Sequence, residues 1–347
     1  MPEPQVIFEL TNLCQLDCIH CLVADRDRTL SLPVDLYEDI LGQVAKYGIH
    51  RVYFTGGEPT LHPRFAEVLD ITSCRGFSFC LVSNGWNFSH TLPVLLKHRQ
   101  ALEWVAFSLD GAKEETHDYM RKPGSYRRVL DALDLCVKEK IPPYLQMVLT
   151  TRNYTEVEEL CNLALEKGVT GLKLTECGPT YRSAQHGLDL SLEQYVEIGK
   201  QVAQLQPKYR PKLLVYMTQA AHPPIPWTGC ELLKMELFSI TAEGYLVLCT
   251  NLAGYAGSPR GAEVVADLKE VSFHEGHRRL IRLIGQVYQD KVDAIEKGTV
   301  SVRECTFPCW YCARYFKKTG WLKEFPDNPW NDKTEPVKAD LSISSQV

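Results

Sequence analysis

The sequence lacks any long apolar segment. No stretch of its 347 residues approaches the roughly 20 apolar residues that a membrane-spanning helix requires. It also lacks an excess of positive charge, because 38 Lys and Arg residues face 43 Asp and Glu residues, for a formal net charge of −5. No basic segment of the kind that opens a signal peptide precedes the first apolar run. We therefore expect no nucleic-acid or membrane partner and a cytoplasmic location.

Sequence repeats and low-complexity tracts are also missing. Hydrophobic residues make up 45% of the chain and charged residues 23%, which excludes a wholly disordered protein and leaves enough apolar mass for a large core. The length predicts roughly two domains. Cysteine, by contrast, is plentiful: the chain has 13, although a protein of this size does not need disulfides for its stability. In a reducing compartment, so many thiols indicate metal or redox chemistry.

Strand-like and helix-like patterns alternate through the first half of the chain. Short apolar, β-branched or aromatic runs predict strands at Val6–Leu10, Arg51–Thr55, Ser78–Val82, Trp104–Leu109, Tyr144–Leu149 and Gly171–Thr175. Helical patterns lie between them, over 31–48, 64–74, 92–98, 126–139 and 155–167. Right-handed crossovers then place helices against a parallel sheet. The predicted fold class is α/β, a partial (β/α)6 TIM-like barrel or an open sheet followed by a small α+β domain, with the chemistry at the carboxyl ends of the strands.

The regular alternation fades after a helical pattern over 191–205. Proline-rich connections follow, so we predict a core domain over 1–205, a linker over 206–229, a small second domain over 230–329 and a mobile tail over 330–347. The second domain has a predicted hairpin, with strands at Leu237–Thr241 and Tyr245–Thr250 around Glu243-Gly244. It also holds five of the cysteines.

Three cysteines follow the first predicted strand in the sequence CQLDCIHC, residues 14–21. One soft metal centre can be bound by Cys14, Cys18 and Cys21. Three thiolate ligands are one fewer than a closed zinc or cubane site needs. An open coordination position is typical of a catalytic site. The alternatives are a zinc knuckle that borrows a fourth ligand such as His20, and cysteines that merely pack.

Polar motifs also follow the next three predicted strands. They are TGGEP at 55–59, SNG at 83–85 and SLDG at 108–111, and all fall where a barrel would hold a ligand. Together with the CxxxCxxC spacing they resemble the radical SAM superfamily, whose signature is CxxxCxxC after the first strand and GGEP after the second. The resemblance covers roughly Val6 to Lys173 and is specific as a set.

The resemblance implies a [4Fe–4S] cluster on Cys14, Cys18 and Cys21, with the amino and carboxylate groups of S-adenosylmethionine (SAM) on the fourth iron. It places His20, where the family usually has an aromatic residue, near the adenine. The other implied cofactor contacts are Gly56, Gly57, Glu58 and Pro59 at the methionine amino group, Asn84 after the third strand, Ser108 and Asp110 at the ribose, and Arg121 at the methionine carboxylate. For Arg121 the alternative is a surface residue at a helix start.

Such an enzyme uses a reduced cluster to cleave the C–S bond of SAM, and the resulting 5′-deoxyadenosyl radical abstracts hydrogen from an unactivated C–H bond. The resemblance implies an oxidoreductase that receives electrons from a flavodoxin- or ferredoxin-type donor. Only thirteen residues precede Cys14, which leaves no room for the N-terminal peptide-recognition domain of many peptide-modifying relatives. We therefore expect a small substrate of sugar or aminocyclitol type that is oxidised or epimerised. The alternatives are a peptide maturase that forms thioether or carbon–carbon links, and a non-catalytic zinc or iron–sulfur protein.

The second domain carries Cys230, Cys249, Cys305, Cys309 and Cys312. The segment GYLVLC at 244–249 has the GxxxxC form found at the hairpin of auxiliary-cluster domains called SPASM or, when shortened, twitch. The resemblance implies an auxiliary [4Fe–4S] cluster on Cys230, Cys249, Cys309 and Cys312, with Cys305 as a spare or substitute. The alternatives are an open site on Cys305, Cys309 and Cys312, which themselves read CxxxCxxC, and a zinc site with four cysteine ligands.

Cys177 follows the sixth predicted strand, at the expected barrel mouth. It is a candidate hydrogen-atom donor of the kind that a radical epimerase needs. Glu9 and Arg182 are either substrate contacts or members of structural ion pairs. The cysteines inside predicted helices and strands are expected to be core residues, and they are Cys74, Cys80, Cys136 and Cys161.

Overall fold

Ten strands form one continuous sheet in the computed structural model, which describes residues 4–178, 180–218, 235, 237–254, 261–300, 304 and 308–331. The order across the sheet is β10-β9-β8-β1-β2-β3-β4-β5-β6-β7. In chain order the strands are β1 (Gln5–Thr11), β2 (Arg51–Gly56), β3 (Ser78–Ser83), β4 (Leu102–Ser108), β5 (Pro143–Leu149), β6 (Gly171–Glu176), β7 (Leu214–Met217), β8 (Leu237–Ile240), β9 (Tyr245–Val247) and β10 (Val264–Asp267).

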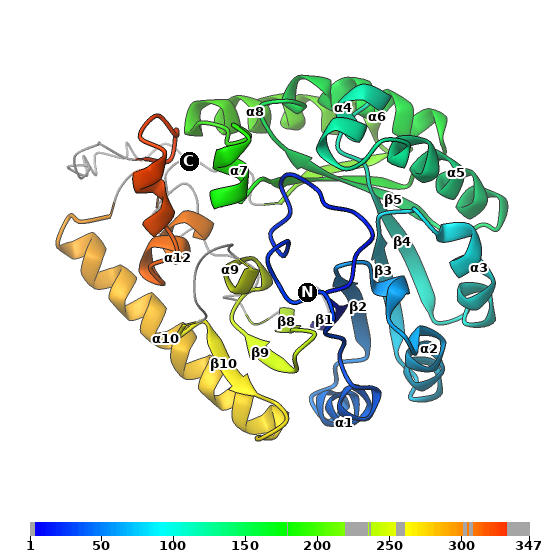
Figure 1. Cartoon of the computed structure of the whole chain (residues 1–347), viewed down its shortest axis with the longest axis horizontal. Coiled ribbons are helices and arrows are strands. Elements are labelled where there is room, and N and C mark those ends of the chain that lie inside the picture. The colour runs from blue at the N-terminus through cyan, green and yellow to red at the C-terminus, as the bar shows by residue number, and fades with distance from the viewer. Residues whose placement is uncertain are drawn as a thin grey trace.

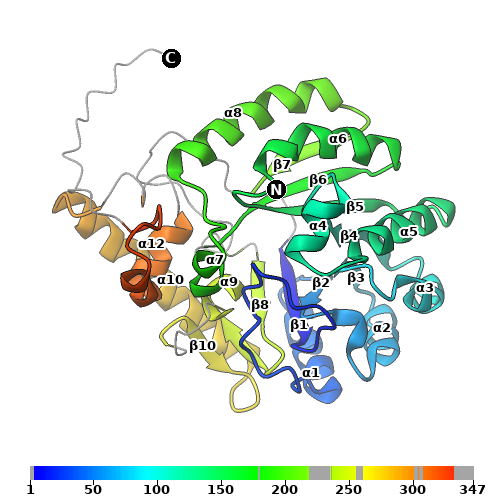
Figure 2. The same ribbon diagram turned by 45° about the horizontal axis from the view of Figure 1, so that its top comes forward.

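Strands β1 to β7 are parallel neighbours in chain order. Val6 of β1 lies opposite Val52 of β2, for example, and Val52 lies opposite Phe79 of β3. Parallel neighbours need a crossover connection, which helices supply here. In Figures 1 and 2 the strands curve into an arc with helices on its outer side, which confirms the predicted partial barrel. The carboxyl ends of these strands therefore meet at one edge, where the cysteine loop crosses the arc in blue (Figure 1).

Helices cover the outer face of the arc and continue into the C-terminal part. The helical segments are α1 (Val34–Ala45), η1 (Pro59–Leu61), α2 (Phe65–Cys74), α3 (Phe88–Lys97), α4 (Glu114–Met120), α5 (Ser125–Lys138), η2 (Tyr154–Glu156), α6 (Val157–Glu166), α7 (Tyr181–Gln185), α8 (Leu192–Tyr209), α9 (Thr250–Gly254), α10 (Phe273–Glu296), α12 (Pro308–Tyr315) and η3 (Gly320–Glu324). Ser191 caps α8 and Ser272 caps α10, each by accepting a backbone hydrogen bond from the third helical residue. Among the described helices, none combines the length and the apolar character that crossing a membrane requires.

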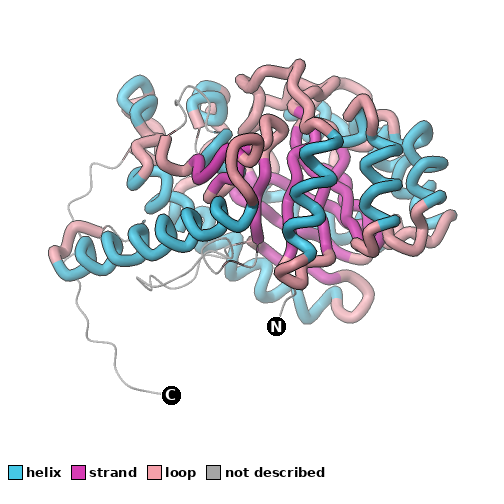
Figure 3. Tube along the Cα trace, turned by 90° about the horizontal axis from the view of Figure 1, so that it is seen from below, coloured by secondary structure: helices cyan, strands magenta, loops and turns pink. Residues whose placement is uncertain are grey.

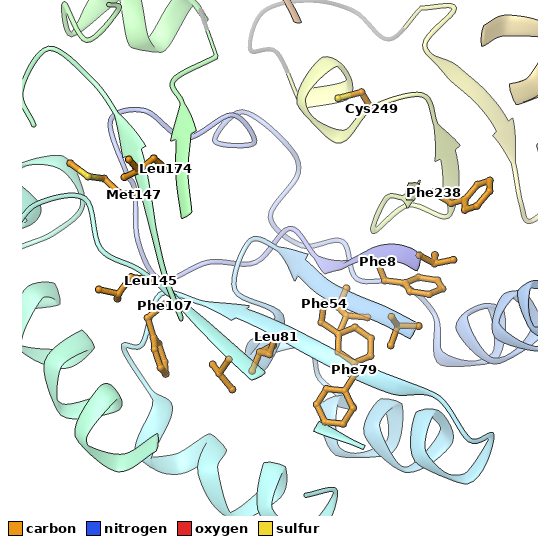
Figure 4. Packing of buried hydrophobic residues seen from close by; sticks show 14 of the residues in the cluster. Phe8, Phe54, Phe79, Leu81, Phe107, Leu145, Met147, Leu174, Phe238 and Cys249 are labelled. Atoms are coloured by element: carbon orange, nitrogen blue, oxygen red, sulfur yellow. The ribbon is translucent and has the colours of Figure 1, made fainter. Parts of the chain in front are cut away.

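The main core lies between the outer face of the arc and these helices. The alternation of side chains along each strand explains this core, because every second residue of a strand faces the helices. Phe8 of β1 packs edge-on against Tyr37 of α1, with ring centroids 4.8 Å apart. Phe54 and Phe79 continue the same layer on the next two strands (Figure 4).

The C-terminal part of the chain extends the same sheet. Strand β8 pairs in parallel with β1 on the side opposite β2, and β9 and β10 follow in antiparallel order. The predicted hairpin is confirmed, with Gly244 in the left-handed region at φ +88° and its N–H donating to Thr241 O. Helix α10 packs on β9 and β10, and Figure 3 shows it running past that end of the sheet.

Two features differ from the elements expected from sequence. Helix α8 continues through Pro207 to Tyr209, and β7 adds a seventh parallel strand within the predicted linker. β7 is a four-residue edge strand, too short for period-two alternation to stand out. Cys74 was expected in the core but is exposed, because it is the last residue of α2 and lies off the helix face that meets the sheet. From position 332 on, the predicted tail lies outside the described residues.

Candidate active site

The cysteine loop between β1 and α1 folds back on itself at the edge of the sheet. Its ends are held together by backbone hydrogen bonds from Asn12 N to Leu30 O and from Leu32 N to Leu10 O. Cys18 is buried, while Cys14 and Cys21 are partly exposed. Burial raises the pKa of all three thiols, that of Cys18 to about 12. Metal ligation requires thiolates, so the loop can bind a metal centre only if neighbouring charges and hydrogen-bond donors stabilise its deprotonated sulfur atoms.

The backbone of the GGEP motif packs directly against the start of the cysteine loop. Gly57 N donates to Thr11 O at 2.7 Å, and Glu58 N donates to Leu13 O at 2.8 Å. A Cβ atom at position 57 would lie 2.4 Å from Leu13 O, a distance that two such atoms do not tolerate. Gly56 has φ +127° and its Cβ would lie 2.5 Å from Thr11 O. These glycines therefore let two backbone segments approach each other closely.

The Glu58 carboxylate is buried and faces the end of β3. Oε1 accepts hydrogen bonds from Ser83 Oγ at 3.0 Å and from Thr60 Oγ1 at 2.8 Å, and Oε2 accepts from Asn84 N at 2.8 Å. Burial raises its pKa, and these donors oppose that shift. The carboxylate thus ties β2 to β3, while the buried Pro59 begins the turn η1 beside it.

Asn84 connects the end of β3 directly to the cysteine loop. Its Nδ2 lies 3.6 Å from Cys14 Sγ as a donor, and its Oδ1 accepts from Gln15 Nε2 at 3.1 Å and from Trp86 N at 3.0 Å. A hydrogen bond to sulfur favours the thiolate over the thiol, because it stabilises the negative charge. Asn84 is therefore placed to stabilise a thiolate at Cys14.

A buried charge cluster lies on the other side of the cysteine loop. The Asp110 carboxylate pairs with Arg121 Nε and lies 3.2 Å from His20 Nε2, and Oδ1 accepts from Val148 N at 2.9 Å. Burial opposes ionisation of Asp110, but the Arg121 charge beside it lowers its pKa to about 2. Burial lowers the pKa of His20 to about 4, so this imidazole is neutral near pH 7.

Ser108 and Cys177 lie at the ends of other strands. Ser108 is the last residue of β4, partly exposed and two residues before Asp110. Cys177 directly follows β6 and is buried, with Sγ 3.9 Å from Gly178 O, and burial raises its pKa well above the ordinary thiol value. Tyr195 of α8 donates from its hydroxyl to Cys177 O at 3.3 Å.

The structure gives roles to charged residues whose place sequence reasoning left open. Glu9 forms a buried ion pair with Arg26. Arg182 of α7 donates from Nε to Cys18 O at 3.0 Å and pairs with Asp17. Both residues are thus members of ion pairs around the cysteine loop. The only sequence signal for Arg182 was its position just after the sixth strand.

The C-terminal cysteines are described in part. Cys249 follows β9 and is buried, Cys312 on α12 is buried, and Cys309 on the same helix is partly exposed. Cys230 and Cys305 lie outside the described residues. Leu248 N donates to Glu263 O at 2.8 Å, and the Glu263 side chain forms a buried ion pair with Lys318, just past α12.

The donor set of the loop suits an iron–sulfur cluster. Within the described parts of the chain, no three His, Cys, Asp or Glu side chains are arranged to hold one metal ion. A [4Fe–4S] cluster makes a different demand, because each thiolate binds its own iron. Asn84 donates toward Cys14, and Arg121 Nη1 lies 3.8 Å from Cys18 Sγ. Donors and a cation directed at sulfur are what a negatively charged thiolate cluster requires.

Comparison with known proteins places this chemistry in a family. Residues 8–164 match the radical SAM superfamily. Residues 8–164 are a radical SAM domain. The cofactors of such a domain are a [4Fe–4S] cluster and SAM, as predicted from the cysteine loop and the GGEP motif.

Curated relatives share part of their sequence with this chain. Mycofactocin maturase MftC of Mycobacterium tuberculosis is 30% identical over 185 residues, which is 53% of this chain and 47% of the relative. The AdoMet-dependent heme synthase of Methanosarcina barkeri is 29% identical over 181 residues, 51% of each chain. The chain therefore spans about half the length of these relatives.

Solved structures share the fold of this chain over more of its length. Streptococcus suis SuiB bound to S-adenosylmethionine superposes with a TM-score of 0.64 at 16% identity, over 80% of this chain and 68% of SuiB. Native anSMEcpe with bound AdoMet gives 0.63 at 16% identity, over 94% of this chain and 99% of anSMEcpe. At such identities the likeness is one of fold.

Proposed function

We propose that this radical SAM protein reductively cleaves SAM at a [4Fe–4S] cluster held by Cys14, Cys18 and Cys21, and that it abstracts hydrogen from a C–H bond of its substrate. When bound, the cluster and SAM supply a one-electron cleavage of the sulfonium C–S bond. The observation that carries the proposal is the support of the cysteine loop from three sides, by GGEP, Asn84 and Arg121. A flavodoxin- or ferredoxin-type protein is the proposed electron donor.

The test is formation of 5′-deoxyadenosine by anaerobically reconstituted protein under dithionite. We expect it in the wild type and expect it to be lost in a C18A variant. C136A is the matched control, because Cys136 is a buried thiol on α5 in the apolar core. Equal product from C18A and wild type would contradict the assignment of Cys18 as a ligand.

The other proposed cofactor contacts line the same edge of the sheet. We propose the Gly56–Pro59 backbone for the methionine amino group, with Asn84 next to it, Ser108 and Asp110 for the ribose, His20 for the adenine and Arg121 for the methionine carboxylate. His20 supports its place in this set by geometry, because its Nε2 faces Asp110 while its buried Nδ1 has no hydrogen-bond partner among the described residues. Protection of these segments from hydrogen exchange by added SAM, in the cluster-loaded protein, is the corresponding measurement.

A peptide is the proposed substrate, with a small molecule as the second candidate. Peptides are supported by two solved structures of this fold, SuiB bound to its precursor peptide SuiA and anSMEcpe bound to AdoMet and the Cp18Cys peptide. A small sugar or aminocyclitol that is oxidised or epimerised is supported by Cys177, a thiol at the end of β6 beside the sheet edge. Candidate substrates deuterated at carbon distinguish the two, because the true substrate transfers deuterium to 5′-deoxyadenosine.

Cys177 is the proposed hydrogen-atom donor in the small-molecule case. A C177A variant is then expected to cleave SAM but to form no epimerised product. Unchanged turnover would dismiss that role and leave Cys177 as a packed residue just after β6. C161A, a buried thiol on α6, is the control for loss of packing volume alone.

We also propose that 230–329 form an auxiliary unit with a second [4Fe–4S] cluster, held by Cys230, Cys249, Cys309 and Cys312, with Cys305 as a spare. The burial of Cys249 and Cys312 in one continuous core supports the proposal. Iron analysis with Mössbauer spectra is the test, and about eight irons per chain are expected from two cubane clusters. About four irons together with stoichiometric zinc would contradict the second cluster.

A further inference from the structure

Arg121 lies between a buried carboxylate and a proposed cluster ligand. It follows α4, whose last residue, Met120, accepts a backbone hydrogen bond from Ile19 N at 3.0 Å. Its Nε pairs with Asp110, and its Nη1 lies 3.8 Å from Cys18 Sγ. The side chain of Arg121 is 9% exposed and that of Asp110 is fully buried. The Asp110 pair thus fixes the guanidinium in a direction that aims one nitrogen at the Cys18 sulfur.

Two guanidinium groups contact the cysteine loop, and they do so at different atoms of the same residue. Arg121 Nη1 lies 3.8 Å from Cys18 Sγ, whereas Arg182 donates from Nε to the backbone oxygen of Cys18 at 3.0 Å. Arg121 therefore differs from Arg182 in touching sulfur itself.

A cation that contacts a ligand sulfur changes the energy of cluster reduction. The cluster gains one negative charge when it is reduced, and a nearby positive charge stabilises the reduced form more than the oxidised form. Hydrogen bonds to cluster sulfurs act in the same direction. A carboxylate beside the same site acts in the opposite direction, because it destabilises added negative charge.

We propose that Arg121, held by Asp110, is a positioning residue that raises the reduction potential of the loop cluster through its contact with Cys18. The contact joins two side chains of the protein itself, so the effect does not depend on a bond between Arg121 and the methionine carboxylate. The proposal rests on the assignment of Cys14, Cys18 and Cys21 as ligands, which is part of the proposed function.

The experiment is an anaerobic redox titration of reconstituted protein, followed by electron paramagnetic resonance, in the absence of SAM. The loop cluster is identified as the signal that a C14A/C18A/C21A variant lacks. In R121Q we expect the ratio of reduced to oxidised cluster at a fixed potential to fall about tenfold, a shift of about 59 mV for a one-electron couple. R121K retains the charge and is expected to shift less than half as far.

Asp110 provides a test of opposite sign. D110N removes a negative charge near the cluster but keeps an amide oxygen that can accept the hydrogen bond from Arg121 Nε. The guanidinium therefore stays directed at Cys18, and the potential is expected to move upward while that of R121Q moves downward. A general loosening of the loop would shift both variants in the same direction. R182Q is the matched control, because it removes a cation from the loop without removing a contact to sulfur.

The outcomes separate this inference from the proposed function. If the triple cysteine variant retains every reducible signal, the ligand assignment fails. If the wild type has the loop signal but R121Q has the same potential, or R182Q shifts it equally, or R121Q and D110N shift it in the same direction, the inference alone fails. A shift in R121Q that requires SAM would also overturn it. Should R121Q lose its iron, the direction of the D110N shift decides.

Discussion

Arg182 of α7 donates a hydrogen bond from Nε to the backbone oxygen of Cys18 at 3.0 Å, although 164 residues separate the two in sequence. Its Nη2 donates to the backbone oxygen of Asp17 at 3.2 Å and pairs with the Asp17 carboxylate. One guanidinium thus satisfies two consecutive backbone carbonyls in the middle of the cysteine loop. Helix α7 therefore holds the central part of this loop against the barrel.

Removing this contact is expected to loosen the cysteine loop. Hydrogen bonds from a charged group contribute about 1.5–3 kcal/mol each, so R182A is expected to lower the free energy of local opening by about 2 kcal/mol. Hydrogen exchange of the 14–21 segment, followed by mass spectrometry, measures this as exchange roughly 30-fold faster than in wild type. R127A is the control, because Arg127 forms an exposed ion pair with Glu114 rather than with the cysteine loop. Equal exchange rates in R182A and wild type would show that the cysteine loop keeps its structure without the Arg182 contacts.

The close approach of GGEP to the cysteine loop predicts an unusually sensitive glycine. In G57A the new methyl group would lie 2.4 Å from Leu13 O and 2.7 Å from Asn12 O, both backbone atoms that cannot rotate away. The loop must shift, so we expect iron incorporation at the loop cysteines to be lost. G42A is the control, because Gly42 is in α1 with its nearest atom at 3.5 Å, the end of the flexible Arg75 side chain. That variant is expected to retain its iron and to be stabilised by about 0.5–1 kcal/mol. Full iron content in G57A would mean that the loop can shift to fit the methyl group and still bind its iron.

Patterns within single elements predicted the strands of the barrel well. β1 to β6 differ from expectation by at most two residues at an end, because each buries alternate apolar side chains against helices. Helix α10 was not predicted, since Gly276 and Gly285 interrupt its sequence. In the structure a Cβ at position 276 would lie 3.0 Å from Leu246, so this glycine serves packing against β9. Local propensity does not include such tertiary contacts.

The candidate site was predicted as a set of residue types, and the structure adds their partners. Spacing and strand order placed Cys18, Glu58 and Asp110 at one edge. Which atoms they contact depends on residues far away in sequence, as with Arg121 at Cys18 or Ser83 at Glu58. A carboxylate in GGEP is expected from its charge alone to meet an ammonium group, but only the order of β2 and β3 shows that it also joins two strands.

Glu176 at the end of β6 predicts a dependence of stability on pH. Its Oε1 is buried and accepts no hydrogen bond from the residues that the structure describes, while Oε2 accepts from Thr218 Oγ1 at 3.3 Å. Burial raises its pKa to about 8, against 4.5 in the unfolded chain. Between these values the folded state binds the extra proton, so stability falls as the pH rises from about 5 through 8.

The E176Q variant tests this directly. Gln cannot ionise, so we expect E176Q to be more stable than wild type at pH 8.5 and to lose most of that advantage at pH 6. Thermal unfolding under anaerobic conditions at the two pH values gives the comparison. E270Q is the control at an exposed glutamate. A constant difference in Tm between E176Q and wild type across this range would contradict the raised pKa.

The buried ion pair between Lys318 and Glu263 predicts that removing Lys318 alone will cost more stability than removing both charges together. The two side chains are 3% and 0% exposed, with Nζ 2.6 Å from Oε1. Removing Lys318 leaves the buried Glu263 carboxylate without its counter-ion, with only the hydrogen bond from Gly261 N among the described residues, so K318M is expected to cost about 3–5 kcal/mol of unfolding free energy. E263Q/K318M buries no net charge at this position and is expected to recover part of that loss. An exposed pair on α10, Glu275 with Arg279, gives the control, and E275Q is expected to cost less than about 1 kcal/mol.

The same pair joins the two segments that carry proposed ligands of the second cluster. Glu263 O accepts from Leu248 N, next to Cys249, while Lys318 N donates to Ala313 O at the end of the helix that holds Cys312. Breaking the pair is therefore expected to separate these segments, and K318M should lose iron from the second cluster before the loop cluster is affected. Iron counts and denaturant midpoints on the same preparations check both effects. If K318M lost stability but kept the full iron content, the pair would support the fold of this region without positioning its cysteines.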